Sequence, residues 1–471
     1  MHVSDESMHQ WCQTLLGARP APHKTLGEYL NATARLSSLA NVPSGTPVFV
    51  RGDVDAKPGA KIGEGDQRLR SMIDTLSFGI EYGWKQIVFG HIGRKPEGSL
   101  AKVAVRLGEL LGKKVPLVGD WLDEGTTTIK PAATDAVRSA QPGDVLVLEN
   151  TRRYDIERVL WDAKPEGLHA IVPKLAKLAN EFAGKIATVY VNEALSAGSL
   201  DSSSTIVPAA MDRVALGLYV AGEFDGPMQR CLQAQLVVFS GLKIDKLDDL
   251  EAMIARGAIR WVITAGSLAM ALKKAAAELD DRRFGLGVAE DPAHADKPYF
   301  IPRERIEQAK RMIADGRRKG IEFVLPVDFI LQDGRSAETI GPADQQFDVG
   351  PKTNEYFAEK VGQFIARAKS SGPAGSNPVA FHNGVFGMFE DPRFESGTKH
   401  FIRQLKRMKD AGVEVYVGGG EGGAALEKYG QPDFVTHCFT AGGTVLNALG
   451  SNPVPYLLAL SMAVARGSRA K

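Results

Sequence analysis

Short apolar runs alternate with amphipathic stretches of helical period along most of the chain, and this alternation restricts the possible folds more than any other feature. The runs are rich in β-branched residues and apolar on both faces, as in strands of a parallel sheet that helices cover on both sides. Strand alternating with helix predicts an α/β protein. The clearest strand candidates are residues 48–51, 86–90, 145–149 and 187–191 in the first half, and 236–240, 261–264, 322–326, 378–381 and 413–417 in the second.

The strand candidates form two successive sets, which predicts two doubly wound lobes. A chain of 471 residues is also too long for one ordinary hydrophobic core. The stretch 204–223, which includes the apolar, helix-compatible sequence AAMDRVALGLYVAG, separates the two sets. We therefore expect one lobe over residues 1–210 and another over residues 211–449. Residues 153–167 and 280–299, together with the N-terminal segment, are predicted to be surface additions.

Composition indicates a soluble globular protein, because 44% of the residues are hydrophobic and 24% are charged. The formal net charge of +1 gives no reason to expect nucleic acid or an anionic membrane as a partner. The cysteines Cys12, Cys231 and Cys438 are scattered and form no CxxC pair, so neither a disulfide framework nor a zinc cluster is expected. Since no signal-peptide pattern and no apolar span of about 20 residues is visible, we expect a soluble, cytoplasmic protein.

A glycine-rich turn, residues 418–423, follows the strand candidate 413–417 and precedes a helical pattern. Such a turn lets the backbone approach phosphate groups and directs helix N–H groups at them. A role in phosphate binding is therefore favoured over a purely structural role. A second turn of small residues, 440–444, precedes another helical run, and two such turns facing one cleft would form a strong anion site. The first turn also satisfies G-x-G-x-x-G, but the acidic residue expected about 20 positions later is missing, so a dinucleotide-dependent dehydrogenase is a weaker alternative.

Charged side chains gather in or near the turns that follow strand candidates of the first half. They are Arg68, His91, Arg94 and Arg152, with Asp53 and Asp55 in the turn after residues 48–51. Ligands of open parallel sheets bind just past the carboxyl ends of the strands. Each residue alone would more often be a surface charge, but together they predict a pocket for a small anionic substrate.

The turns and their flanking residues resemble the motifs of the phosphoglycerate kinase family. In the first half, VFVRGDVDAKPG is similar to VRVDFNVP, GHIGRKPEGSLAKVAVRL to HLGRP-G-SL-PVA, GDVLVLENTRRY to GDVLLLENLRF, and YVNEALSAGSLDSSST to YVNDAFGTAHRAHSST without gaps. In the second half, VVFSGLKIDK is similar to GGAKVSDK, FDVGPKT to DIGPKT, FHNGVFGMFE to WNGPMGVFE, VGGGEGGAAL to GGGDTAAA, and DFVTHCFTAGG to H-STGGG. The motifs occur in the family's order from about residue 47 to residue 460, and the ordered set is highly specific.

The resemblance implies a fold and a reaction. The family has two Rossmann-like, three-layer lobes of doubly wound parallel sheet joined by a helical hinge, and its C-terminal segment, here residues 450–471, packs back on the first lobe. It transfers a phosphoryl group in glycolysis from 1,3-bisphosphoglycerate to ADP, giving 3-phosphoglycerate and ATP. The resemblance therefore implies a monomeric kinase, with ATP or ADP and a molecule of the 3-phosphoglycerate type as ligands and Mg²⁺ as cofactor.

The resemblance also implies roles for particular residues. The implied substrate-binding residues are Asp53, Asp55, Arg68, His91, Arg94 and Arg152, with Asp55 standing where the family has asparagine. The implied nucleotide-binding residues are Lys243, Lys246, Gly266, Asn383, Glu390, Gly419, Gly420, Glu421 and Gly422, and Glu421 is the implied Mg²⁺ ligand. The implied catalytic residues are Arg68, Lys243, Gly442 and Gly443, which would neutralise charge on the phosphoryl group during transfer.

The chain departs from the family pattern at several positions. Leu200 replaces a substrate-binding arginine, and Ser199 and Ser202 replace two histidines. Lys246 follows Lys243 one residue too early for the family spacing. The other replacements are Glu421 for aspartate, Gly422 for threonine, His382 for tryptophan and ITAGSL for IGGGMA. Two alternatives therefore stay open: a catalytically impaired binding or regulatory protein of this family, and a kinase for a different acyl phosphate.

Overall fold

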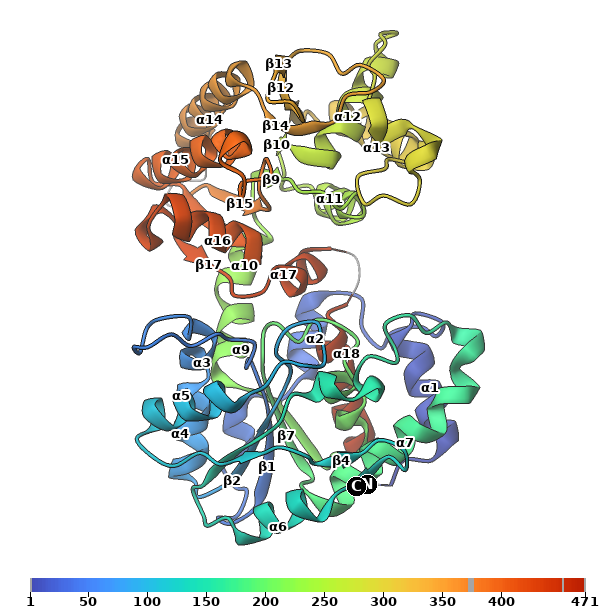
Figure 1. Cartoon of the computed structure of the whole chain (residues 1–471), viewed down its shortest axis with the longest axis vertical. Helices are drawn as coiled ribbons and strands as arrows, with labels where there is room; N and C mark the ends of the chain where they lie inside the picture. Colours follow the sequence, from blue (N-terminus) through green and yellow to red (C-terminus); the bar gives the residue numbers. More distant parts are fainter. Residues whose placement is uncertain (1, 372–376, 451–452, 470–471) are drawn as a thin grey trace. The chain divides into compact units, whose positions relative to one another are not determined.

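The computed structural model describes residues 2–371, 377–450 and 453–469, and the chain divides into two compact units (Figure 1). The first unit comprises Met1–Asp225 and Pro453–Lys471, and the second comprises Gly226–Asn452. Each contains a six-stranded parallel sheet flanked by helices, which confirms the predicted α/β class with two parallel-sheet lobes. None of the helices in the described ranges is long and apolar enough to cross a membrane.

The sheet of the first unit has the strand order β3-β6-β2-β1-β7-β8, and every neighbouring pair is parallel. Its central strands are almost wholly buried, which explains why their sequences are apolar on both faces. The strands are β1 (Pro47–Gly52), β2 (Lys85–Phe89), β3 (Leu117–Val118), β6 (Val145–Leu148), β7 (Val189–Glu193) and β8 (Arg213–Leu216). A small antiparallel pair, β4 (Leu122–Asp123) and β5 (Thr128–Ile129), lies outside this sheet.

Helices cover both faces of this sheet, so the first unit has three layers. On one face, Leu76 and Leu107 pack with Val88 in one hydrophobic cluster. On the other face, the ring of Phe182 lies edge-on against the ring of Phe49. The helices of this unit are α1 (Asp5–Leu15), α2 (Leu26–Ala32), α3 (Gln67–Ser71), α4 (Ile73–Glu81), α5 (Ala101–Leu111), α6 (Pro131–Ser139), α7 (Leu168–Lys185), α8 (Ser202–Thr205), α9 (Leu218–Asp225) and α18 (Pro455–Arg469).

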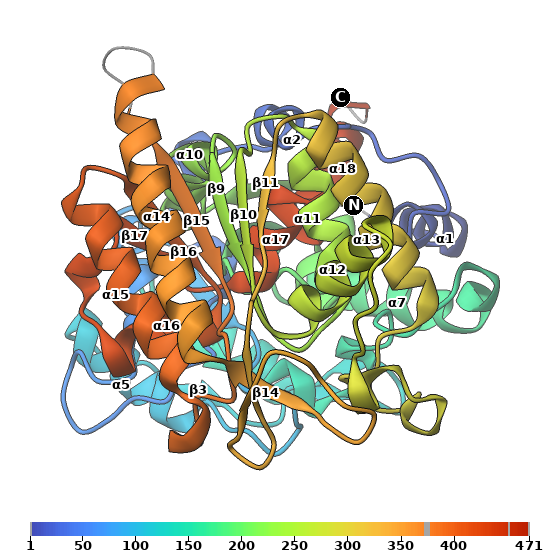
Figure 2. The same cartoon turned by 90° about the horizontal axis from the view of Figure 1, so that it is seen from above.

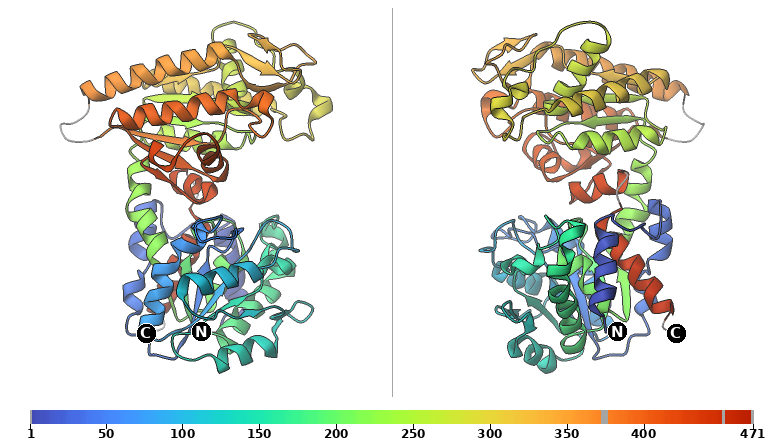
Figure 3. Two further views of the ribbon diagram at one scale, coloured as in Figure 1. Left: turned by 60° about the vertical axis from the view of Figure 1, so that its left-hand side comes forward. Right: turned by 90° about the vertical axis from the view of Figure 1, so that its right-hand side faces the viewer.

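The first unit ends at Asp225, later in the chain than the predicted boundary after residue 210. The reason is that β8 hydrogen-bonds to β7 and completes the first sheet, and α9 follows it within the same unit. The C-terminal helix α18 also belongs to this unit, where it lies against α2 and α8 (Figure 3). Arg466 of α18 donates a hydrogen bond to the Ala209 carbonyl oxygen (2.8 Å).

The sheet of the second unit has the order β11-β10-β9-β15-β16-β17, again with parallel neighbours throughout. Its strands are β9 (Leu236–Phe239), β10 (Trp261–Thr264), β11 (Glu322–Val324), β15 (Val379–Asn383), β16 (Glu414–Gly418) and β17 (His437–Cys438). A separate antiparallel sheet has the order β13-β12-β14, formed by β12 (Phe329–Leu331), β13 (Ser336–Ala337) and β14 (Gln346–Val349).

The second unit also has three layers (Figure 2). On one face of the sheet, Phe357, Phe401 and Leu426 pack with Val238 and Val415 in one core cluster. These three side chains come from α14 (Pro351–Ser371), α15 (Ser396–Asp410) and α16 (Gly420–Tyr429). The opposite face carries α11 (Lys246–Ala255), α12 (Gly266–Leu279) and α13 (Arg303–Arg318), and the unit also contains α10 (Pro227–Cys231) and α17 (Gly442–Leu449).

Candidate functional site

The carboxyl ends of β1, β2, β6 and β7 meet at one edge of the first sheet, because all four strands run in the same direction. The turns that follow these strands, together with α3, carry the residues predicted to bind the substrate. The structure brings these residues into two neighbouring clusters, with Arg94 as the exception. Arg94 is exposed, and its carbonyl oxygen accepts a hydrogen bond from Arg158 Nη1 (3.3 Å).

The first cluster, called the Arg68 cluster below, consists of Arg68, Asp53, Asp55 and Ser196. Arg68 Nη1 lies 3.0 Å from Asp55 Oδ2, and Arg68 Nε lies 3.8 Å from Asp53 Oδ1. Ser196 Oγ donates a hydrogen bond to Asp53 Oδ1 (2.7 Å). Burial raises the pKa of Asp53, whereas the Gly93 N–H and the charge of Arg68 outweigh burial at Asp55 and lower its pKa. Arg68, Asp55 and Ser196 are partly exposed, whereas Asp53 is buried.

The second cluster, called the Asp201 cluster below, consists of Asp201, Arg51, His91 and Arg152. Asp201 Oδ2 lies 3.1 Å from Arg152 Nη2, 3.3 Å from His91 Nδ1 and 3.7 Å from Arg51 Nη2. His91 Nδ1 also lies 2.8 Å from Arg51 Nη2. All four residues are buried. Two of the predicted substrate residues, His91 and Arg152, therefore contact a carboxylate of their own chain.

The charge states of the Asp201 cluster follow from its contacts. Burial alone would raise the pKa of Asp201, but the contact with His91 and the charges of Arg152 and Arg51 outweigh it and lower that pKa. Burial, reinforced by the charge of Arg51, lowers the pKa of His91 in spite of its contact with Asp201. Asp201 is accordingly a carboxylate at neutral pH, and His91 is neutral.

Sequence reasoning missed Asp201 and Arg51. Asp201 stands where the family motif YVNDAFGTAHRAHSST has alanine, so the signal was present in the gap-free comparison. The prediction that residues 153–167 are a surface addition is wrong for part of the segment, because Tyr154, Ile156, Glu157 and Leu160 are buried. Trp161 Nε1 donates to Asp201 Oδ1 (2.9 Å), and buried Glu157 accepts from the backbone N–H of Ser203 (2.9 Å). The segment therefore holds the turn that carries Asp201.

In the second unit, two glycine turns contact each other at the start of two helices. Gly419 precedes α16 with φ +98°, a left-handed backbone conformation that favours glycine. Gly442 opens α17, and a Cβ atom there would lie 2.4 Å from the Gly419 Cα atom. Asn383, at the end of β15, donates from Nδ2 to the Gly418 carbonyl oxygen (3.0 Å) and fixes the first turn. Gly420 and Gly443 have open space where a side chain would stand, and Gly422 is buried against Val417.

Two predicted nucleotide lysines lie close to this region, in different environments. Lys243 is exposed in the turn before α11. Lys246 is partly buried, donates from Nζ to the Ser240 carbonyl oxygen (2.8 Å), and has its pKa lowered chiefly by burial in spite of the charge of Glu421. Glu421 itself is exposed in the first turn of α16.

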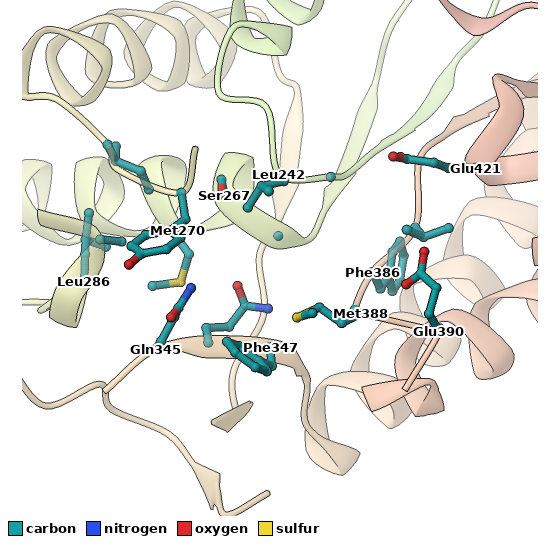
Figure 4. A pocket seen from close by; sticks show the side chains of 18 residues that line it. Leu242, Ser267, Met270, Leu286, Gln345, Phe347, Phe386, Met388, Glu390 and Glu421 are labelled. Carbon is teal, nitrogen blue, oxygen red and sulfur yellow. The ribbon is translucent and has the colours of Figure 1, made fainter. Parts of the chain in front are cut away.

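A cavity of about 450 Å³ opens beside these groups, entirely within the second unit. Figure 4 shows Glu421 and Glu390 on one side of it and Met270, Leu286 and Gln345 on the other. Its lining also includes the predicted residue Gly266, along with Gly241, Leu242, Ser267, Ala289, Tyr299, Ile301, Gln346, Phe347, Val385, Phe386, Gly387 and Met388. Gly266 has φ +64°, and a Cβ atom there would lie 2.6 Å from the Gly241 carbonyl oxygen, so the cavity floor requires glycine.

The prediction that residues 280–299 are a surface addition is also wrong for part of the segment. Leu286, Ala289 and Tyr299 line the cavity, so the segment forms one of its walls. The cavity is large enough for a small organic ligand, and its mixture of apolar side chains with a few polar groups is typical of ligand pockets.

The phosphoglycerate kinase family model matches residues 40–452. The chain belongs to the phosphoglycerate kinase family. Cytosolic phosphoglycerate kinase of Triticum aestivum is 29% identical to it over 442 residues, which cover 89% of this chain and 96% of that protein. Phosphoglycerate kinase of Saccharomyces cerevisiae is 29% identical over 435 residues, covering 88% of this chain and 95% of that protein.

Solved phosphoglycerate kinase structures share the fold. Those from Coxiella burnetii and Pyrococcus horikoshii match with TM-scores of 0.63 and 0.68, each at 23% sequence identity. The matches cover 93% and 92% of this chain, respectively, and the whole of each solved chain. At this level of identity the likeness shows the fold alone, and family membership indicates a phosphotransferase of the kinase type.

Membership of the phosphoglycerate kinase family implies a nucleotide substrate and typically a metal ion. Within the described ranges, no group of three or more His, Cys, Asp or Glu side chains is arranged to hold a metal ion. Mg²⁺, however, is usually bound by only one or two carboxylates together with substrate phosphates and water. Glu421 meets that requirement, because it is an exposed carboxylate in the first turn of α16, beside the glycine turns.

His382, which stands where the family motif has tryptophan, should make the stability of the second unit depend on pH. Burial lowers the pKa of His382 from 6.5 to about 4. The unfolded chain therefore binds a proton at this histidine below about pH 6.5, whereas the folded chain does so only near pH 4. The free energy of unfolding should thus fall as the pH drops through this range, by at most about 3 kcal/mol.

We expect His382→Phe to remove this dependence, because phenylalanine keeps the ring contacts with Phe386 and Phe401 and cannot titrate. The measurement is urea unfolding of both proteins at about pH 7 and about pH 4.5. Taking the difference between the proteins removes the terms from other groups, such as Asp348, whose pKa burial raises to about 7. Equal pH dependence in the two proteins would contradict the prediction.

Proposed function

We propose that this protein is a magnesium-dependent phosphotransferase that moves a phosphoryl group between a nucleotide and the carboxylate of a small acid. The observation that carries the proposal is the contact between the glycine turns at Gly419 and Gly442. Each turn opens a helix, α16 or α17, whose N-terminus has no side-chain cap within the described residues. Two helix N-termini side by side offer backbone N–H groups and positive helix-dipole ends, which favour binding of a chain of phosphates.

The cavity of the second unit supports a nucleoside as the attached group. Its apolar side chains Met270 and Leu286 suit a base, and the Glu390 carboxylate suits ribose hydroxyl groups, as the family resemblance implies. Glu421 would hold Mg²⁺, which would offset the negative charge of the phosphates. Lys243 and Lys246 would add positive charge beside the phosphates.

The Arg68 cluster of the first unit supports binding of the acid. In the direction of acid phosphorylation, a carboxylate oxygen of the acid attacks the γ-phosphorus of ATP. The bond between that phosphorus and the β,γ-bridging oxygen breaks, and ADP leaves with the bridging oxygen. The reaction needs no nucleophilic side chain, so the protein acts by positioning the partners and neutralising charge. Arg68 would neutralise charge on the transferring group.

The acid in the family reaction is 3-phosphoglycerate, and it is the first acid to test. The carboxylate of Asp201 against Arg152 and His91 favours the alternative of a different acid. An assay of ATP formation distinguishes a kinase from a binding module. The protein is given ADP and Mg²⁺ with either 1,3-bisphosphoglycerate or acetyl phosphate as the acyl phosphate. Binding of ADP without ATP formation from either donor would favour the module.

We expect Gly420→Val to remove nucleotide binding without harming the fold. A Cβ atom at Gly420 meets open space in the unliganded protein, so its melting temperature should match that of the wild type. Mg²⁺–ADP should raise the melting temperature of the wild type, as any ligand selective for the native state must. The variant should lack that increase, because its side chain would occupy the space of the phosphates. An equal increase in both proteins would mean that ADP binds elsewhere.

A further inference from the structure

Asp201 is a fixed negative charge inside the predicted substrate region. It is completely buried, and its partners Arg152 and His91 are only 6% and 5% exposed. Arg152 Nη1 is also bonded, to the Gly93 carbonyl oxygen (2.7 Å). The guanidinium group of Arg152 lies over the ring of Trp161 at 4.8 Å. Arg152 is therefore enclosed by its own chain, with Nη2 bonded to Asp201, and its buried Nε has no hydrogen-bond partner among the described residues.

The position of Asp201 argues against a purely local role in the helix that follows it. Asp201 directly precedes α8, yet its carboxylate does not cap that helix. The carboxylate instead receives hydrogen bonds from Arg152 Nη2 and Trp161 Nε1. The next residues hold this arrangement, because Ser202 Oγ donates to the Ile156 carbonyl oxygen (2.7 Å) and Ser203 Oγ donates to Glu157 (2.6 Å).

The cations of the Asp201 cluster are already paired within the chain. Arg152 and Arg51 lie 3.1 Å and 3.7 Å from Asp201, and Ser203 joins Arg51 to the buried Glu157. His91 adds no charge while it is neutral. Leu200, next to Asp201, is an alkyl side chain where the family motif has a substrate-binding arginine. A second anionic group of the acid would thus meet a buried carboxylate beside Arg152.

We propose that Asp201 fills, from within the chain, the place of a second anionic group of the substrate. The acid bound by the first unit is then a monocarboxylate whose remaining groups are uncharged. This inference rests on the proposed function for its reaction and names the substrate class of that same site. Arg68 and Asp55, which are partly exposed, would position the single carboxylate and its hydroxyl groups.

The test compares two acids with one carbon skeleton, glycerate and 3-phosphoglycerate, by isothermal titration of the whole chain. The wild type should bind glycerate more tightly than 3-phosphoglycerate. Asp201→Asn keeps an acceptor and a similar shape but removes the charge. It should tighten 3-phosphoglycerate binding by about tenfold to a hundredfold, the value of one charge-assisted contact, and change glycerate binding little. Tighter binding of 3-phosphoglycerate than of glycerate by the wild type would overturn the proposal.

The comparison of the two acids on the wild type needs no variant, so it stays decisive if removal of the charge destabilises the fold. A second variant adds a different measurement, the melting temperature. Asp201→Ala leaves Arg152 and Arg51 without their carboxylate, so inorganic phosphate should raise its melting temperature more than that of the wild type. The matched control is Asp66→Ala, which removes another buried carboxylate of the same unit, paired with Arg106 and Arg70. Phosphate should stabilise this control no more than the wild type. Absence of selective stabilisation of Asp201→Ala would overturn the proposal.

Both readouts measure binding and do not require turnover. If the two acids are discriminated as expected but no phosphoryl transfer occurs with either, the proposed function fails and the assignment of Asp201 stands. If transfer occurs and 3-phosphoglycerate is the better ligand of the wild type, the proposed function stands and the assignment of Asp201 fails.

Discussion

Arg68→Ala is expected to lower kcat by about 10²- to 10³-fold, and to raise the KM of the acid much less. The reason is that a guanidinium group directed at the transferring phosphoryl group acts mainly on charge that develops in the transition state. Arg68 is suited to this role because it is the partly exposed cation of its cluster, held by Asp55 at 3.0 Å and Asp53 at 3.8 Å. Initial rates at saturating Mg²⁺–ATP, with the acid varied, provide both constants.

Arg70→Ala is the matched control for this experiment. Arg70 lies on the same helix and carries the same charge, but it is exposed and pairs with Asp66 (3.0 Å) outside the Arg68 cluster. Its replacement should change kcat by no more than about twofold, because the exposed Arg70 side chain lies outside the Arg68 cluster. Equal losses in both variants would mean that the effect comes from α3 as a whole, and an unchanged kcat in Arg68→Ala would remove Arg68 from the mechanism.

Gly442→Val is expected to damage both the fold and the nucleotide site of the second unit. A Cβ atom at residue 442 would lie 2.4 Å from the Gly419 Cα atom, so the two glycine turns must move apart. Overpacking of this kind costs about 1–3 kcal/mol of stability. Mg²⁺–ADP binding should weaken by about a hundredfold, since displaced N–H groups lose charge-assisted hydrogen bonds to phosphate. Urea unfolding and isothermal titration measure the two effects.

Gly443→Ala is the control for the stability effect, because a Cβ atom there meets open space. Its unfolding free energy should equal that of the wild type. A Gly442→Val protein with wild-type stability and wild-type ADP affinity would show that contact between the two turns is unimportant for either property.

The sequence predicts the framework of the fold well, because the framework depends on local pattern. Runs such as 236–240 and 261–264 correspond to β9 and β10, where burial on both faces selects apolar residues at every position. The predicted boundary after residue 210 is wrong, because local pattern does not determine which sheet a strand joins. Residues 213–216 form a strand whose partner, β7, is decided by long-range pairing, and the local pattern carries no information on that pairing.

The candidate site was harder to predict, because its decisive contacts join distant segments. Strand ends identify Asp53, His91 and Arg152 as neighbours, but the pattern does not reveal that Asp201 turns its carboxylate to Arg152. The sequence predicts surface positions for segments without strand or helix periodicity. Two of them supply Trp161 to the Asp201 cluster and Tyr299 to the cavity, since irregular segments are positioned by side-chain contacts and lack a periodic signature.

The most direct test of the central proposal is the trapping of an acyl phosphate. The protein is incubated with Mg²⁺–ATP, hydroxylamine, and either glycerate or 3-phosphoglycerate, so that any acyl phosphate formed is converted to a stable hydroxamate. We expect hydroxamate and ADP in equal amounts, dependent on the acid and on Mg²⁺, and lost in Arg68→Ala. A protein that binds Mg²⁺–ADP yet forms hydroxamate from neither acid would contradict the proposed function and leave a binding module of the phosphoglycerate kinase family.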